Sequence, residues 1–212
     1  MPPEPPYRAL DRTRPYQGKL VSVRVDHLAS PSGETTTREV VEARGAVAGL
    51  AVDEQGRVLL VEQWRNAPGG RLVEIAAGQY DVDGEAVEAA LRRELAEELG
   101  VGGGTATWLA SVHTTPGWSD EVVDLFLVEG VRPLSPRERG KVAKGVWEEA
   151  ELRVLRLGLE EAMALAATPP GDAKTLLALA LYGLKHAGVW TSDQAGRPAP
   201  DAPARRAAAR PG

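Results

Sequence analysis

Three glutamates crowd one side of a predicted helix in the segment at residues 85–100, EAVEAALRRELAEELG. With about 100° of rotation per helical residue, Glu94 and Glu98 fall at the edge of the apolar stripe, and Glu97 lies on their flank. Like charges three and four residues apart repel each other, and more strongly where the dielectric constant falls. We therefore expect a positive charge among these carboxylates.

A bound divalent cation is the predicted source of this charge. Arg93 is next to Glu94 in the sequence, but on a helical wheel it points roughly 100° away from that residue. The chain contains no cysteine and only three histidines, so it has little material for a zinc site or a disulfide framework. A hard metal held by oxygen atoms is the metal chemistry that remains. Taken alone, the glutamates would more often form a solvated helix face, and the surrounding residues decide against that alternative.

These surrounding residues extend the pattern on both sides. Nine positions of GQYDVDGEAVEAALRRELAEELGV carry it, namely Gly78, Glu85, Arg93, Glu94, Leu95, Glu97, Glu98, Gly100 and Val101. The arrangement resembles the Nudix box, which reads Gly, five residues, Glu, seven residues, then Arg-Glu-aliphatic-any-Glu-Glu-any-Gly-aliphatic. The chain departs from it by one extra residue between Gly78 and Glu85. That residue lies in the expected loop, so the spacing on the helix is intact.

The resemblance implies a hydrolase that uses Mg²⁺, with Mn²⁺ as an alternative, to cleave a diphosphate. It implies that Glu94, Glu97, Glu98 and the carbonyl of Ala77 bind the metal, while Arg93 holds the glutamates in place. Metal at this position would neutralise charge on the leaving phosphate and orient the attacking water. Glu98 and Arg93 are therefore candidate catalytic residues.

Further segments resemble the ADP-ribose pyrophosphatase subgroup of this family. The strings EQWR and TREVVE contain Arg65 and Arg38 and are expected on strands. The resemblance implies that both arginines contact phosphate or the terminal ribose through paired hydrogen bonds. A salt bridge at a strand edge is the alternative for each. Pro116 stands at the subgroup's marker position and is assigned to substrate binding, so ADP-ribose, cleaved to AMP and ribose 5-phosphate, is the expected substrate.

A general base is expected from a loop after the sheet, in KGVWEEAEL at residues 144–152. The resemblance assigns this role to Glu149, and Glu148 and Glu151 are the alternatives. Whichever residue serves must come within hydrogen-bond reach of the attacking water when the loop closes.

The elements that position these residues predict an α/β fold, a Nudix-like α/β/α sandwich with a mixed sheet. Alternating residues around a Pro-Ser-Gly turn predict a hairpin, and two apolar runs predict a second, buried one. The expected strands lie at residues 19–29, 35–42, 46–52, 58–64, 72–76, 107–112 and 122–128, and the expected helices at 85–99, 159–167 and 172–188. Interleaved strands and helices favour this sandwich over a doubly wound parallel sheet.

The chain is expected to divide into four segments. Residues 1–16 and 190–212 are rich in Pro, Ala, Arg and Asp, and we expect disordered tails because they offer little apolar surface to bury. Residues 17–43 are expected to form an antiparallel β-ribbon, and residues 44–189 the Nudix hydrolase domain. In the family the ribbon exchanges between subunits, so the resemblance implies a homodimer whose active site borrows residues from both chains.

Composition limits the partners. A formal net charge of −5 gives no general attraction to nucleic acid or to an anionic membrane. The longest apolar run is about half of the roughly 20 residues that cross a bilayer. The first residues lack the apolar core of a secretory signal, so a cytoplasmic protein acting on a small nucleotide sugar is expected.

Other functions remain open at this stage. The substrate could be another nucleotide sugar or a dinucleotide, which the sequence does not separate from ADP-ribose. The chain could also be a catalytically silent sensor of an ADP-ribose-type ligand, although every carboxylate of the box is present. A purely structural α/β domain would leave the glutamates at the edge of the apolar stripe unexplained.

Overall fold

The computed structural model describes residues 6–80, 82, 84–140 and 151–190. The strands are β1 (Arg8–Gln17), β2 (Val21–Ala29), β3 (Thr35–Ala43), β4 (Ala46–Asp53), β5 (Val58–Arg65), β6 (Gly70–Glu74), β7 (Ala76–Gln79), β8 (Val101–His113), β9 (Val122–Pro133) and β10 (Arg153–Leu157). The helices are α1 (Val87–Glu98), α2 (Pro136–Arg139), α3 (Leu159–Ala166) and α4 (Ala173–His186).

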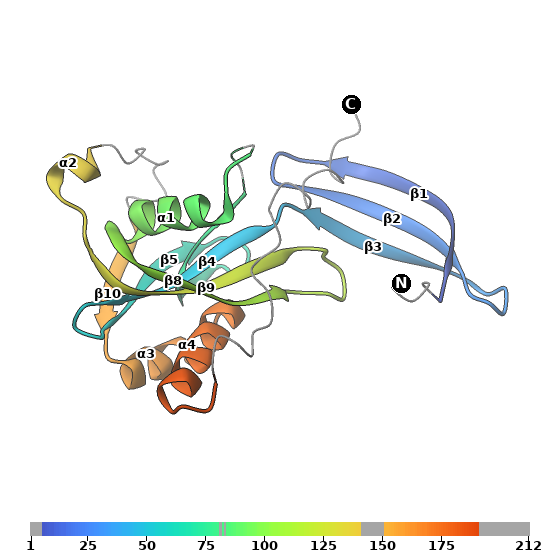
Figure 1. The fold of residues 1–212 in the computed structure, drawn as a ribbon. Helices are drawn as coiled ribbons and strands as arrows, with labels where there is room; N and C mark the ends of the chain where they lie inside the picture. The colour runs from blue at the N-terminus through green and yellow to red at the C-terminus, as the bar shows by residue number, and fades with distance from the viewer. Residues whose placement is uncertain (1–5, 81, 83, 141–150, 191–212) are drawn as a thin grey trace.

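A mixed sheet forms the centre of the body, with α1 on one face and α3 and α4 on the other (Figure 1). Its strands follow the order β10-β5-β4-β9-β8, with β6 paired to β5 and β7 paired to β4. Strands β4 and β9 run parallel, whereas the other pairs are antiparallel. The predicted α/β/α sandwich with a mixed sheet is confirmed.

The two central strands diverge soon after their hairpin turn. Strands β4 and β5 pair only next to the turn, and further along β5 pairs with β6 while β4 pairs with β7. The chain therefore crosses from one central strand to the other between β6 and β7, at Ile75. This crossing lies shortly before Ala77 and Gly78. The carbonyl of Ala77 is a predicted metal ligand, and Gly78 is the first residue of the predicted motif.

Both faces of the sheet are packed. Leu50 and Leu60 belong to the core beneath α3 and α4, and Leu59 packs with Leu91 and Leu95 beneath α1. Burial of each such side chain contributes about 1.5–3 kcal/mol. Every residue of β4 is buried, and the unbroken apolar run at residues 46–52 is what a strand covered on both faces predicts.

Helix α1 lies close to the sheet because β4 carries a glycine beneath it. A Cβ at Gly49 would stand 2.6 Å from Cδ1 of Leu91, so only glycine allows this approach without a shift. The helix ends where the sequence predicts, with Leu99 donating to the carbonyl of Leu95 at 3.2 Å and Gly100 at a φ of 65°.

Strands β1, β2 and β3 form a separate antiparallel sheet that projects from the body (Figure 1). The predicted disorder of residues 1–16 is wrong for residues 8–16, which pair with β2 in β1. Backbone pairing with β2 holds this exposed strand, and ion pairs accompany it: Arg12 contacts Asp26 at 2.7 Å, and Arg14 contacts Glu42 at 2.8 Å. The N-terminal ribbon therefore includes residues 8–43 and has three strands.

Three elements of the body were not predicted, and one is β7, since the expected strand at residues 72–76 ends where β7 begins. Helix α2 is a single turn whose start is stabilised by a capping box between Ser135 and Glu138. Strand β10 extends the sheet beside β5. Apart from Trp190, the expected C-terminal tail at 190–212 lies outside the described residues. No helix in the described ranges is long and apolar enough to cross a membrane.

Candidate active site

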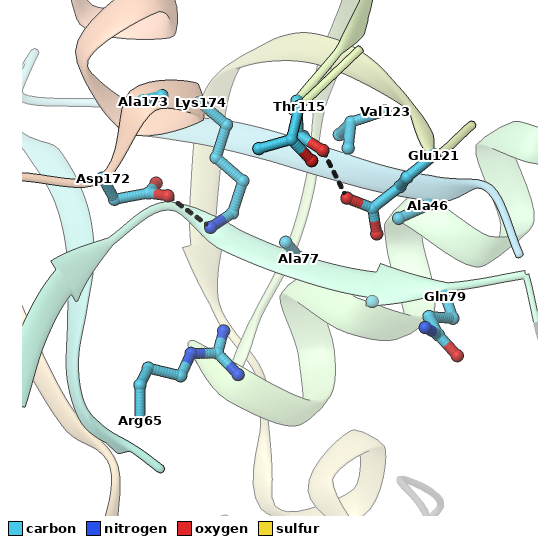
Figure 2. A pocket seen from close by; sticks show the side chains of 12 residues that line it. Ala46, Arg65, Ala77, Gln79, Thr115, Glu121, Val123, Asp172, Ala173 and Lys174 are labelled. Atoms are coloured by element: carbon cyan, nitrogen blue, oxygen red, sulfur yellow. Dashed lines mark hydrogen bonds and ion pairs between the residues drawn. The ribbon is translucent and has the colours of Figure 1, made fainter. Parts of the chain in front are cut away.

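A pocket of about 460 Å³ opens where β7, the loop between β8 and β9, and the start of α4 meet (Figure 2). It is lined by Ala46, Arg65, Ala77, Gly78, Gln79, Thr114, Thr115, Glu121, Val123, Asp172, Ala173 and Lys174. Its wall therefore carries two cations and two carboxylates. It also includes part of β7, the strand before α1; because α1 bears Glu94, Glu97 and Glu98, we call it the carboxylate helix. Of the residues predicted for the site, Arg65 and Ala77 lie on this wall.

Gly78 on β7 allows the carboxylate helix to lie close to this strand. A Cβ at this position would lie 2.0 Å from Cδ of Glu94 and 2.1 Å from its Oε1, so the carboxylate of Glu94 occupies the space that a side chain would need. The side chain of Glu94 is only 11% exposed. The glycine and the glutamate of the predicted motif are thus in direct contact.

Arg93 binds three glutamates at once. Its Nη1 lies 2.5 Å from Oε1 of Glu94 and 3.2 Å from Oε2 of Glu97, and its Nη2 lies 3.2 Å from Oε2 of Glu85. The expectation that Arg93 points away from Glu94 is wrong, because the helical wheel gives the direction of Cβ and this long side chain folds back. The geometry fits the other expectation, that Arg93 holds the glutamates in place.

Glu98 projects from the last turn of α1 towards β7. Its Oε2 accepts a hydrogen bond from the backbone N–H of Ala77 at 3.1 Å. Burial is the main cause that raises the pKa of the Glu98 carboxyl to about 7; Glu94 and Glu74 act in the same direction, whereas the Ala77 N–H and Arg65 oppose them. The folded site therefore disfavours the charged form of Glu98, mainly because burial removes the carboxylate from water.

The chemistry of these side chains fits a hard divalent cation. Every donor of the predicted set is an oxygen atom, as Mg²⁺ prefers, and the raised pKa of Glu98 marks a place where added positive charge is favourable. Across the described ranges, no three acidic or histidine side chains converge closely enough to hold an ion as they stand. Arg93 lies between Glu94 and Glu97, so these side chains must rotate to act as ligands.

A second charged group, missed from the sequence, borders the first. Glu74 is 1% exposed and receives Arg65 in a bidentate pair, with Nε at 2.7 Å from Oε1 and Nη2 at 2.9 Å from Oε2. Lys174 reaches Oε2 of Glu74 at 2.5 Å. An acidic residue in an otherwise apolar strand was the available sequence signal for Glu74, but nothing in the sequence indicated Lys174.

The loop between β8 and β9 joins the pocket to the N-terminal sheet. Thr114 donates to Oε2 of Glu121 at 2.7 Å, and both residues line the pocket. The same loop bonds to β3, since the N–H of Val41 donates to the carbonyl of Trp118 at 2.7 Å and the N–H of Ala43 donates to Oδ1 of Asp120 at 2.9 Å. The pocket wall and the N-terminal sheet are therefore connected by hydrogen bonds from the backbone of β3.

The structure does not gather the remaining predicted residues in the pocket. Arg38 is exposed on β3 and donates to Oγ1 of Thr36 and to a neighbouring carbonyl. Pro116 is exposed in the loop next to the lining residue Thr115. Glu148 and Glu149 lie outside the described residues, and Glu151 is exposed, with an oxygen 3.9 Å from Arg71. These assignments stay predictions.

A comparison with protein families identifies the domain. The NUDIX domain matches residues 42–179, more than half of the chain. The chain belongs to the Nudix family. The matched Nudix region runs from the end of β3 into α4, so it contains the carboxylate helix and also Lys174 at the start of the last helix.

Nudix proteins of known activity are close in sequence. The ADP-ribose pyrophosphatase of Mycobacterium tuberculosis is 38% identical over 157 residues, which cover 71% of this chain and 76% of that protein. The ADP-ribose pyrophosphatase of Bacillus subtilis is 34% identical over 173 residues, which cover 81% and 90% respectively. The predicted membership of the Nudix hydrolases is confirmed.

A solved structure shares the Nudix fold. The crystal structure of an ADP compounds hydrolase matches with a TM-score of 0.72 at 22% identity, and covers 87% of this chain and 97% of that one. At this identity the likeness concerns the fold, including the arrangement of sheet and helices that forms the pocket.

Proposed function

We propose that this Nudix protein hydrolyses ADP-ribose to AMP and ribose 5-phosphate with the help of Mg²⁺, for which Mn²⁺ is the alternative. The similarity to two ADP-ribose pyrophosphatases over most of the chain carries this proposal. In the reaction, water adds to one phosphorus, and the bond from that phosphorus to the bridging oxygen breaks. The bridging oxygen leaves with the other phosphate.

The carboxylate helix supplies the residues that would hold the ion. Glu94, Glu97, Glu98 and the carbonyl of Ala77 are this set, and bound metal would supply Lewis-acid stabilisation of the diphosphate charge and a more acidic water. Arg93 keeps Glu94 and Glu97 side by side. With the metal-binding side of α1 against β7, the diphosphate would lie in the adjoining pocket.

Arg65, which lines the pocket, is the residue proposed to bind the substrate. Its Nε and Nη2 are taken by Glu74, and the other edge of its guanidinium remains for an oxyanion. Pro116 and Arg38 are further proposed contacts, with Arg38 supplied by the second subunit of a homodimer. Glu149 is the proposed general base, and the cytoplasm is the proposed location.

An assay of the purified full chain tests this function. ADP-ribose, GDP-mannose, UDP-glucose, NADH and diadenosine polyphosphates are incubated separately with Mg²⁺, and the products are identified by chromatography. We expect the highest kcat/KM with ADP-ribose and equal amounts of AMP and ribose 5-phosphate. A higher kcat/KM with another compound in this panel would replace ADP-ribose as the substrate. Tight binding of ADP-ribose without cleavage would identify a sensor instead of an enzyme.

A further inference from the structure

The first turn of α4 is fastened to the crossing between β6 and β7. The N–H of Ile75 falls between these strands and donates to Oγ1 of Thr175 at 2.8 Å. The hydroxyl of Thr175 in turn donates to Oδ2 of Asp172 at 2.5 Å, and the same carboxylate caps the helix by accepting from the N–H of Thr175 at 3.0 Å. Both Ile75 and Thr175 are fully buried, so this joint is a fixed point beside the pocket.

Lys174 adds a charged contact to this joint. Its Nζ lies 2.5 Å from Oε2 of Glu74 and 3.0 Å from Oδ1 of Asp172, and its side chain is 14% exposed. Two carboxylates take two of the three N–H donors of this partly buried ammonium, which leaves at most one for a phosphate. Figure 2 shows Lys174 turned towards Asp172. Lys174 is thus placed to hold protein groups instead of substrate.

The group that Lys174 holds is the one that orients Arg65. Burial opposes the ionisation of Glu74, yet the hydrogen bond from Arg65 and the charge of Lys174 outweigh it and leave the pKa of Glu74 lowered. Oε2 of Glu74 accepts from Arg65 and from Lys174 together. Without Lys174, only Arg65 among the described residues would neutralise this buried carboxylate, and the carboxylate could rotate or draw the guanidinium inwards.

The other edge of Arg65 faces the pocket. Within the described ranges Nη1 of Arg65 has no hydrogen-bond partner, while Nε and Nη2 are held by Glu74. The guanidinium is planar, so fixing one edge also fixes the direction of the other. Its pKa is raised, first by the hydrogen bond to Glu74, so it stays charged.

We propose that Lys174 is a positioning residue that acts through Glu74 to aim Arg65 at the diphosphate, an inference that rests on the proposed function. Lys174 contacts no substrate in this role. Its effect passes from Lys174, at the start of α4, through the carboxylate of Glu74, 100 positions away in the chain, to Arg65 at the end of β5. Substrate binding should therefore depend on Lys174 only as long as Arg65 is present.

The test compares Lys174→Met with a matched control at the other end of the same helix. Lys185→Met removes a lysine that pairs with Glu129 and does not line the pocket. The dissociation constant of ADP-ribose is measured by calorimetry in EDTA, and KM and kcat are measured with Mg²⁺. We expect Lys174→Met to raise the dissociation constant and KM about tenfold, with kcat within about twofold of wild type, and Lys185→Met to change none of these values.

Two further variants separate positioning from folding and from direct contact. Lys174→Arg keeps the charge and should recover most of the affinity, and Lys174→Gln replaces Lys174→Met if the latter fails to fold by circular dichroism. In an Arg65→Ala background, Lys174→Met should have no further effect on affinity. A second tenfold loss in that background would show that Lys174 acts without Arg65 and would overturn the inference.

The same measurements separate this inference from the proposed function. If wild type binds and cleaves ADP-ribose while Lys174→Met behaves like wild type, the positioning role fails and the function stands. If wild type neither binds nor cleaves ADP-ribose, the proposed function fails and the inference fails with it.

Discussion

Gly78 and Glu94 depend on each other at the level of single atoms. The carboxylate fills the volume in which any other residue would carry its Cβ, so the spacing between β7 and α1 leaves no room for a side chain. A glycine at this point is required by close approach, because its φ is not among the positive values found elsewhere in the chain.

Replacement of Gly78 by alanine should therefore act on Glu94. We expect Gly78→Ala to displace the carboxylate, to raise the Mg²⁺ concentration for half-maximal activity at least about tenfold and to leave the fold intact, because the loss of groups that support a metal ligand costs about 10–100-fold. Metal titration of the activity checks this. The matched control is Gly70→Ala, since no atom lies within 4 Å of a Cβ there. Unchanged metal dependence in Gly78→Ala would mean that Glu94 is not a ligand.

Glu98 carries the strongest individual prediction. Gln has nearly the same size and keeps the hydrogen bond from Ala77, but it removes the charge that a metal would need. We expect Glu98→Gln to lower kcat by at least about 100-fold at saturating Mg²⁺, with an unchanged circular dichroism spectrum. Glu88→Gln is the control, because Glu88 is exposed on the same helix and pairs with Arg92. Near-full activity of Glu98→Gln would remove Glu98 from the metal site.

At the scale of elements, apolar periodicity predicted the strands and helices of the body well. Strands β4 and β5, helix α1 and helix α4 carry long apolar patterns with recognisable ends, such as the Asp172 cap and Gly100. Strand β1 has no such pattern and is held by backbone pairing with β2 and by ion pairs with β2 and β3. The apolar pattern within a segment predicts which of its residues are buried. The ion-pair partners of a polar strand are distant in the chain, so the sequence of the strand alone does not indicate them.

The same distinction holds for the candidate site. The carboxylate helix was predicted because all its glutamates and Arg93 lie within one segment. The pairing of Glu74 with Lys174 joins residues 100 positions apart, and only the folded chain brings them together. The prediction that Arg93 points away from Glu94 is wrong because a helical wheel shows only the direction of Cβ and not the length of the side chain.

The N-terminal sheet should respond to pH through Glu42. Hydrogen bonds from Arg14, and then from Arg24, keep the pKa of this carboxyl below its ordinary value of 4.5 despite partial burial. Because the folded-state pKa is lowered, the stabilisation is present above about pH 4.5 and is lost as the pH falls through the lowered pKa. We expect Glu42→Gln to weaken the sheet by about 1 kcal/mol at pH 7.

Amide hydrogen exchange of β2 and β3 measures this difference locally. The gap between wild type and Glu42→Gln should close as the pH falls below 4.5. Glu39→Gln on the same strand is the control, since Glu39 is exposed. A gap that persists at low pH would assign the stabilisation to packing instead of charge.

At the scale of the whole molecule, the position of Arg38 leads to the prediction about assembly. Within one chain, Arg38 is exposed on the projecting sheet and is not part of the pocket wall. If Arg38 serves the active site of a second subunit, each site takes Arg38 from one chain and Glu98 from the other chain. Arg38→Ala and Glu98→Gln then remove residues that different chains contribute to one site. A heterodimer of these two variants would then contain one intact site.

Mixing the two inactive variants tests this arrangement. After co-refolding, we expect activity to recover to about a quarter of the wild-type value, because about half of the dimers are mixed and each has one working site of two. Light scattering checks that the mixture is dimeric, and a mixture of Glu98→Gln with itself is the control. No recovery in a dimeric mixture would place Arg38 outside the partner's active site.

The hydrogen bonds between β3 and the loop after β8 have a mechanical consequence. The N–H of Val41 donates to the carbonyl of Trp118, and the N–H of Ala43 donates to the side-chain Oδ1 of Asp120. Thr115 and Glu121 on the same loop line the pocket. If the projecting sheet bends relative to the body, these hydrogen bonds would displace the loop that forms one wall of the pocket. Truncation of the first 43 residues would release that wall as well as remove the sheet.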